Sequence, residues 1–224
     1  MTKSPTPDFT PALGPRGSIG LYDHVIALLT REKQWRAKLL AALAPANGET
    51  IVDIGAGTAS MAILIKTKRP GVRMIALDPD PDIRLIAEKK AAKAGTDLEF
   101  ITALGDAEID DQLAPGTADK VLTSLVLHQC PIPVKKSILA SAFRLLKPGG
   151  MLLIADYGRQ RSVFMKLAFN LVRLTDGFDD TRANKDGRLP DFMLNAGFSN
   201  VQERSVTLTP TGSISLYTAT KQEA

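Results

Sequence analysis

Short apolar runs alternate with helical apolar patterns along most of the chain. Five runs with the character of buried strands occupy residues 50–54, 72–77, 98–102, 119–126 and 151–157. Apolar residues at helical spacing mark residues 61–68, 83–91, 131–146 and 162–175. Because alternating strands and helices connect through right-handed crossovers, the pattern predicts an α/β domain with a mainly parallel sheet covered on both faces.

The two ends of the chain carry other patterns. Residues 1–17 are rich in Pro, Thr and Gly and predict a flexible lead-in, whereas residues 18–46 predict a helical segment, either one bent helix or two. Near the other end, we expect a polar loop at residues 176–188 and a short helix closed by Gly197. Two strands joined by a tight turn follow at 200–220 and complete a seven-stranded sheet.

The first apolar run leads into a glycine turn. Asp53 lies in the run, and Gly55 and Gly57 follow one residue apart. Alternating glycines let the backbone turn tightly and let a ligand lie against bare main chain. Dinucleotide-binding folds also begin with a strand and a glycine turn, but Ser60 stands where their last glycine is expected. Asp53 would face the pyrophosphate of a dinucleotide, so its carboxylate favours a cationic ligand instead.

Acidic residues follow the next two strands. Asp78 ends the second run, about 20 residues after Gly57, which fits one βαβ unit. In a parallel sheet it would lie beside the glycine turn, where it could accept hydrogen bonds from both hydroxyls of a ribose. Asp106 follows the third run, and capping of a helix is an alternative role for it.

A family resemblance rests on four motifs in order. They are Val52-Asp53-Ile54-Gly55-Ala56-Gly57, Leu77-Asp78, Gly105-Asp106-Ala107 and Leu146-Lys147-Pro148-Gly149-Gly150. From about residue 50 to 156 the chain resembles the class I S-adenosylmethionine-dependent methyltransferases, of the ubiquinone/menaquinone-biosynthesis type. That family often carries a third glycine where this chain has Ala59. The resemblance implies a Rossmann-like doubly wound fold with an antiparallel last strand and N-terminal helices.

The same resemblance implies the cofactor and its contacts. S-adenosylmethionine would be the methyl donor and S-adenosylhomocysteine the product. Asp53 would lie near the amino or sulfonium group, although a structural carboxylate bonded to loop amides is the alternative. Asp78 would hold the ribose, and Asp106 with Ala107 would read the adenine edge. The expected cofactor contacts are Asp53, Gly55, Ala56, Gly57, Asp78, Pro79, Asp106, Ala107 and Tyr22.

The methyl acceptor is expected on the other side of the site. His128 follows the fourth strand and could act as a general base toward a hydroxyl acceptor, or simply line the pocket. Asp156, Tyr157 and Arg159 lie at or just past the end of the fifth strand and are candidate substrate contacts, together with Phe178. The transfer itself needs alignment of the reacting atoms and no metal.

Residues 162–187 are long for a plain crossover and could form a lid over an apolar acceptor. The apolar side of this segment carries Phe164, Leu167 and Leu171, and packing of that side on the sheet is the alternative. Three basic residues, Arg161, Lys166 and Arg173, suggest peripheral contact with an anionic membrane.

The elements together predict one domain, residues 18–224. Within it we assign residues 18–46 to an N-terminal cap and residues 158–195 to acceptor-side helices.

Composition limits the remaining choices. A chain of 224 residues, 44% hydrophobic, is large enough for one core. No run of about 18 apolar residues or secretion signal is present, and the single Cys130 excludes an internal disulfide, so we expect a cytoplasmic protein. The net charge is +4, but the basic residues are scattered, and we expect no nucleic-acid partner.

We interpret the chain as a methyltransferase for a small, partly apolar acceptor, with O-, N- or C-methylation open. A dinucleotide-dependent oxidoreductase is the second enzyme hypothesis. A non-catalytic protein that binds the cofactor on the same fold is the third.

Overall fold

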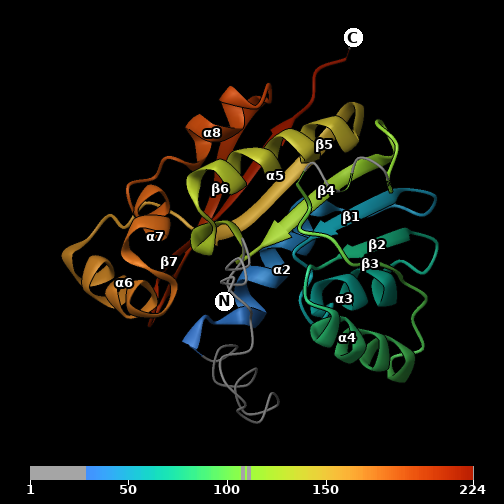
Figure 1. Cartoon of the computed structure of the whole chain (residues 1–224), viewed down its shortest axis with the longest axis horizontal. Helices are drawn as coiled ribbons and strands as arrows, with labels where there is room; N and C mark the ends of the chain where they lie inside the picture. Colours follow the sequence, from blue (N-terminus) through green and yellow to red (C-terminus); the bar gives the residue numbers. More distant parts are fainter. Residues whose placement is uncertain (1–28, 107–108, 110–111, 224) are drawn as a thin grey trace, which may run out of the picture.

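A seven-stranded sheet forms the centre of the protein, with strand order β3-β2-β1-β4-β5-β7-β6 (Figure 1). The computed structural model describes residues 29–106, 109 and 112–223. Neighbouring strands from β3 to β5 are parallel, whereas β7 runs antiparallel to both β5 and β6. The strands are β1 Thr50–Ile54, β2 Arg73–Leu77, β3 Glu99–Ile101, β4 Ala118–Ser124, β5 Leu146–Tyr157, β6 Ser199–Thr209 and β7 Gly212–Thr220. The predicted Rossmann-like fold, including the antiparallel last strand, is confirmed.

Helices cover both faces of this sheet (Figure 1). Alternate residues of β1 show the division, since Ile51 joins one apolar cluster and Val52 and Ile54 join the other. The helices are α2 Glu32–Leu43, α3 Ser60–Lys68, α4 Pro81–Lys93, α5 Ile132–Leu145, α6 Val163–Asp176, α7 Phe178–Lys185 and α8 Leu189–Asn195. One cluster contains α5 and α8, and the other contains α2, α3 and α6. None of the helices in the described part of the chain is long and apolar enough to cross a bilayer.

The strand order reverses between β1 and β4, where ligands bind in open α/β sheets. Asp53 lies on the same face of β1 as Ile51, the face that α2 covers with Trp35 and Leu39. Of the predicted N-terminal cap, the structure describes α2. Residues 1–28, which include the expected lead-in and Tyr22, lie outside the described part.

The segment 176–188, predicted as a polar loop, contains the helix α7 instead. Its buried face carries Thr181, Ala183 and Asn184, so the helix has little apolar periodicity to detect. Hydrogen bonds replace apolar contacts there. The Thr181 hydroxyl donates to the Gly177 carbonyl at 2.6 Å, and Asn184 Nδ2 donates to the Tyr157 carbonyl at 2.9 Å.

Strand β5 begins at Leu146, earlier than the predicted residue 151. Leu146 pairs with Ala118, and the pairing resumes at Met151 opposite Lys120, so the residues between form an irregularity inside the strand. Lys147 Nζ binds Asp119 Oδ1 at 2.7 Å within it. The Lys-Pro-Gly-Gly motif therefore ends α5 as expected, but it belongs to the strand that follows.

Helix α6 packs on the sheet through a side that differs from the apolar side identified in the sequence. Its buried residues are Met165, Phe169 and Val172. Phe164, Leu167 and Leu171 are exposed. The helix is apolar on both sides, and periodicity alone did not separate the packed side from the exposed one.

Two glycines with positive φ provide a test of the packing at the end of β1. Gly105 has φ +80°, and a Cβ there would meet Ile54 Cγ2 at 2.4 Å, whereas Gly95 has φ +63° with open space around it. We expect Gly95→Ala to lower the free energy of unfolding by about 1 kcal/mol, from backbone strain alone. Gly105→Ala should cost about 1–3 kcal/mol more, because the methyl group overpacks the core. Urea unfolding of both variants measures the difference, and equal losses would show that Ile54 moves freely.

Candidate functional site

The glycine turn after β1 is hydrogen-bonded to the end of β2. The Ala56 N–H donates to the Leu77 carbonyl at 2.8 Å, and the Gly57 N–H donates to Asp78 Oδ2 at 2.8 Å. Asp78 therefore lies beside the turn, where its position after the second strand predicted it. The turn, the start of α3 and the end of β2 form one connected edge of the sheet.

The surroundings of the two glycines in the turn differ. Gly55 has φ +71°, and a Cβ there would lie 2.3 Å from Val126 Cγ2, so packing excludes a side chain. Gly57 has φ +55°, and a Cβ there would meet nothing within 4 Å. No described residue therefore fills the space beside the main chain at Gly57, which suits a ligand lying against it.

Ala59 occupies the position where the resembling family often has glycine. Its φ is +56°, in the left-handed region that glycine favours, and it precedes the first residue of α3. The residue is completely buried in the apolar cluster beneath α2. The turn therefore keeps its conformation with alanine, at the cost of backbone strain.

Asp53 is completely buried, and neither carboxyl oxygen has a hydrogen-bond partner among the described residues. The alternative prediction, a carboxylate bonded to loop amides, is therefore wrong for this structure. Burial raises the pKa of Asp53 to about 8; the positive charge of Arg36 opposes this rise and the charge of Asp78 adds to it. Such a carboxyl group is costly for the fold alone and suits a cationic partner.

The Asp78 carboxylate can accept more hydrogen bonds than the two that it accepts from the backbone. Oδ2 accepts from Gly57, and Oδ1 accepts from the Asp80 N–H at 3.0 Å. Burial raises the pKa of Asp78, while these two backbone hydrogen bonds lower it. Because a carboxylate can accept about four hydrogen bonds, two remain for the hydroxyls of a ligand. Pro79 lies half-buried between Asp78 and Asp80.

Asp106 follows β3 and lies next to the end of β1. Gly105, directly before it, packs against the side chain of Ile54. The Asp106 carbonyl accepts from the Ile109 N–H at 3.2 Å. Two further predicted contacts, Ala107 and Tyr22, lie outside the described residues.

His128 lies buried between two carboxylates. It belongs to a 3-10 helix, Leu127–Gln129, that follows β4. Nδ1 is 2.7 Å from Asp156 Oδ1, and Nε2 is 3.2 Å from Asp176 Oδ2. Burial lowers the pKa of His128, but the carboxylates of Asp156 and Asp176 outweigh it and raise the pKa to about 9. The ring is therefore an imidazolium at neutral pH, with both N–H groups engaged.

Asp156 is the hydrogen-bond centre of this cluster. Besides the imidazole it accepts the backbone N–H groups of Val126 at 3.2 Å, His128 at 3.3 Å and Tyr157 at 2.7 Å. These bonds connect the ends of β4 and β5. The sequence identified Asp156 as a candidate. It did not identify Asp176, because Asp176 begins a polar stretch, residues 176–188, in which no motif distinguishes one acidic residue from another.

The predicted acceptor residues occupy different environments. Tyr157 is buried, its hydroxyl is 2.7 Å from Thr211 Oγ1, and its ring lies 4.9 Å from the His128 ring. Arg159 is exposed and packs against Gly187. Phe178 is half-exposed beneath the Arg173 guanidinium, which lies 4.4 Å from the ring centre. The structure brings only Tyr157 next to His128.

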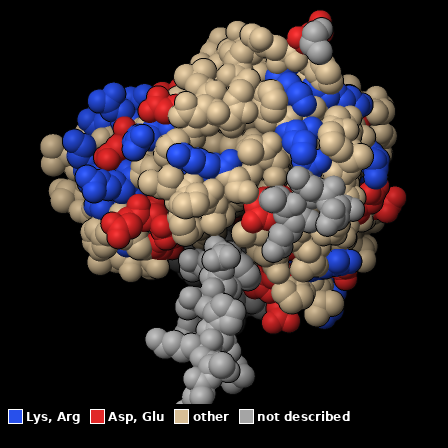
Figure 2. Space-filling model, turned by 45° about the horizontal axis from the view of Figure 1, so that its top comes forward, with Lys and Arg blue, Asp and Glu red and all other residues tan. Residues whose placement is uncertain are grey.

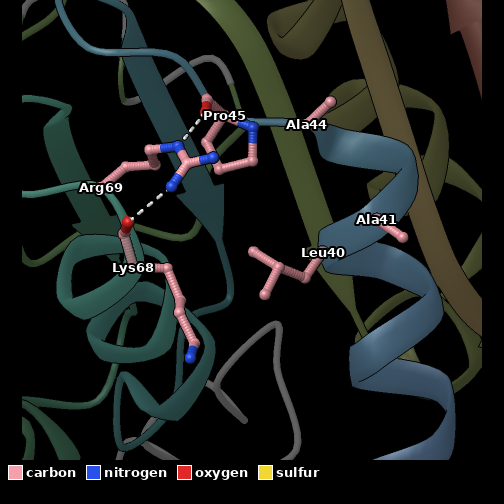
Figure 3. Close-up of a pocket in the computed structure, with 6 residues that line it drawn as sticks. All are labelled: Leu40, Ala41, Ala44, Pro45, Lys68 and Arg69. Atoms are coloured by element: carbon pink, nitrogen blue, oxygen red, sulfur yellow. Dashed lines mark hydrogen bonds between the residues drawn. The ribbon is translucent and has the colours of Figure 1, made fainter.

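A separate pocket lies at the opposite, amino ends of the strands, and Figure 3 shows the residues that line it. It has a volume of about 270 Å³ and lies between the carboxyl ends of α2 and α3, lined by Leu40, Ala41, Ala44, Pro45, Lys68 and Arg69. Arg69 Nε donates to the Pro45 carbonyl at 3.1 Å. Because these residues precede β1 and β2, the pocket is at the amino ends of the strands and takes no part in the site.

No group of three or more potential ligands for a metal ion occurs among the described residues. The polar groups at the carboxyl ends of the strands are instead the Asp53 carboxyl, which has no hydrogen-bond partner in the described structure, the Asp78 carboxylate at the glycine turn, and the His128 imidazolium between two acids. This set suits an organic cation that also carries neighbouring hydroxyls.

The chain is similar to known methyltransferases in sequence and in fold. Residues 20–175 match the ubiE/COQ5 methyltransferase family. A demethylmenaquinone methyltransferase of Clavibacter sepedonicus is 28% identical over 208 residues, 83% of this chain and 81% of that protein. One of Thermus thermophilus is 25% identical over 142 residues, 61% of this chain and only 60% of that protein. An O-methyltransferase family protein of Burkholderia thailandensis has a similar fold, with a TM-score of 0.68 and 21% identity over 88% of this chain and 58% of its own.

The carboxylates around His128 predict an unusual titration. Because protonation of His128 is favoured in the folded state, its contribution to stability is complete below about pH 6.5 and disappears as the pH rises through about 9. NMR should show one imidazole that stays protonated above pH 8, and the variant His128→Gln identifies its signal. Asp176→Asn should lower the pKa of His128. A His128 signal that titrates near pH 6.5 in the unmodified protein would contradict the geometry.

Proposed function

The chain belongs to the ubiE/COQ5 methyltransferase family, and from this premise we propose that it transfers a methyl group from S-adenosylmethionine to a small, partly apolar acceptor. The observation that carries the proposal is the buried carboxyl group of Asp53, which has no hydrogen-bond partner in the described part of the chain, close to the main chain of Gly57, beside which no described atom lies where a Cβ would. A cation at that place would satisfy Asp53 and lower its pKa.

The residues at the strand ends fit the parts of S-adenosylmethionine. Asp53 would face the amino or sulfonium group, and Gly55, Ala56 and Gly57 would let the molecule lie on the main chain. Asp78 and Pro79 would hold the ribose hydroxyls. Asp106 and Ala107 would bind the adenine, and Tyr22 stays a proposed cofactor contact from the sequence. When bound, S-adenosylmethionine supplies an electrophilic methyl group on a good leaving group.

His128 is the proposed general base for a hydroxyl acceptor. Asp156 binds Nδ1 and fixes the ring, whereas Asp176 reaches Nε2 from α6 at 3.2 Å. If the Asp176 side chain moved away from the ring, Nε2 would be exposed. Without the negative charge of Asp176 beside it, the pKa of His128 would fall toward neutrality. Nε2 would then accept the proton of the acceptor hydroxyl, with Asp156 holding the ring as an orienting carboxylate does in other base dyads.

For the acceptor we propose the quinol class. The two relatives described above are named demethylmenaquinone methyltransferases, and the reduced, quinol form of such a molecule is an apolar ring with ionisable hydroxyls. The Tyr157 ring, 4.9 Å from the His128 ring and 4.8 Å from the Phe169 ring, gives this side of the site an aromatic character that suits such a molecule. Arg159 and Phe178 are proposed as outer contacts of the acceptor. Neither a dinucleotide nor a purely regulatory role is favoured by a specific observation.

Cofactor binding can be tested through Asp53. S-adenosylhomocysteine lacks the sulfonium charge, so Asp53→Asn should weaken S-adenosylmethionine by about 1.5–3 kcal/mol and S-adenosylhomocysteine by less. Asp78→Ala should weaken both ligands equally, because both carry the ribose. Calorimetry measures these affinities, and it should also show proton release when S-adenosylmethionine binds below pH 8. Unchanged affinity in Asp53→Asn would remove this residue from the site.

Methyl transfer itself needs a direct assay. Radiolabelled methyl groups should pass from S-adenosylmethionine to a demethylated quinol, and His128→Gln should lower kcat about 100-fold or more while leaving cofactor affinity unchanged. Asp176→Asn is the matched variant and should shift the pH profile of kcat/KM to lower pH. Binding of S-adenosylmethionine without transfer to quinols, phenols, thiols or amines would favour a non-catalytic protein. Full activity of His128→Gln would show that no base is needed.

A further inference from the structure

The outer face of α6 is a continuous apolar surface exposed to solvent. It consists of Val163, Phe164, Leu167, Leu171 and Leu174, with Phe178 at the start of α7, and the exposed fractions are 74%, 68%, 63%, 56%, 70% and 51%. These are six of the ten large apolar side chains that are exposed in the described part of the protein. Scattered exposed apolar residues are ordinary, but a clustered set marks a surface that binds something.

Among the described residues, α6 packs on the sheet through its other side. Met165, Phe169 and Val172 are buried there, and Phe169 contacts Tyr157. Helix α6 begins with a cap, since Ser162 Oγ accepts the Met165 N–H at 3.1 Å, and its inner side holds it on the sheet. The helix is therefore firmly seated without its outer face, and packing within the described residues does not explain that face.

Basic residues flank the outer face along α6, and the acidic Asp179 and Asp180 follow Phe178 in the first turn of α7. Lys166 is exposed, and Arg173 binds Asn170, Thr181 and the Phe178 carbonyl with no carboxylate partner among the described residues. Asp176, the one acidic residue of α6, turns inward to His128. Figure 2 shows Lys and Arg gathered at the left end of the molecule, where α6 and α7 lie in Figure 1, with some acidic side chains beside them.

We propose that the outer face of α6 docks the protein on the surface of an anionic lipid bilayer. A helix of 14 residues is about 21 Å long, too short to span a hydrocarbon core of about 30 Å, but suited to lie in the interface. Apolar side chains on one face with basic residues on the flank are the pattern of such interfacial helices.

A second copy of the chain fits this face less well. A helix face about 21 Å long and about 10 Å wide offers roughly 200 Å², whereas a stable dimer buries about 800 Å² on each partner. A dimer would also bring together the flanks that carry Lys166 and Arg173. A bilayer needs no such area and attracts those charges.

Docking on lipid goes beyond the proposed methyl transfer and is measured without it. The full chain should sediment with vesicles of phosphatidylcholine mixed with phosphatidylglycerol, and more weakly with vesicles of phosphatidylcholine alone. The double variant Leu167→Ser/Leu171→Ser should reduce partition to the mixed vesicles about tenfold or more. Lys166→Glu should reduce binding to the mixed vesicles only.

The matched control is Leu85→Ser/Leu194→Ser, which changes two leucines that are each 54% exposed but lie on α4 and α8. It should bind vesicles as the unmodified chain does. Phe164→Trp gives a second readout, since its fluorescence should shift to the blue on mixed vesicles. The proposal is overturned if the chain ignores mixed vesicles, if the Leu167/Leu171 variant binds normally, or if the Trp emission does not move. Dimers in ultracentrifugation that this variant dissolves would identify a second copy as the occupant instead.

Discussion

Two hydrogen bonds between the glycine turn and the end of β2 define the geometry on which the candidate site depends. They join Ala56 to the Leu77 carbonyl and Gly57 to the Asp78 carboxylate. These bonds tie the turn to the end of β2 and place the main chain at Gly57 directly beside the Asp78 carboxylate. One carboxylate thus shapes the loop and keeps acceptor capacity for a ligand.

The buried acids of this protein differ in how well they are satisfied. Asp156 accepts three backbone N–H groups and an imidazole, whereas Asp53 accepts nothing from the described residues. A satisfied buried carboxylate organises its surroundings, and an unsatisfied one is a cost to the fold. That contrast, rather than acidity alone, supports the proposed roles of Asp156 in positioning His128 and of Asp53 in ligand binding.

Much of the fold followed from apolar periodicity, because buried parallel strands are short apolar runs between helices. The position of Asp78 beside Gly57 followed from the same logic, since consecutive parallel strands end at one edge. Helix α7 did not, because its buried face is Thr181 and Asn184, and hydrogen bonds leave no hydrophobic period. The approach of Asp176 to His128 depends on which side of α6 packs inward, and a helix that is apolar on both sides leaves that choice to tertiary structure.

The contact between Asp176 and His128 connects α6, a helix at the surface, to a buried imidazole that gains and loses a proton. Because one carboxylate around the imidazole belongs to α6, the position of that helix and the protonation of His128 form a single linked equilibrium. Any event that moves the end of α6 must change the proton affinity of the ring. By reciprocity, a rise in pH that deprotonates His128 must weaken the attachment of α6 by the same free energy. The position of α6 therefore depends on whether His128 is protonated.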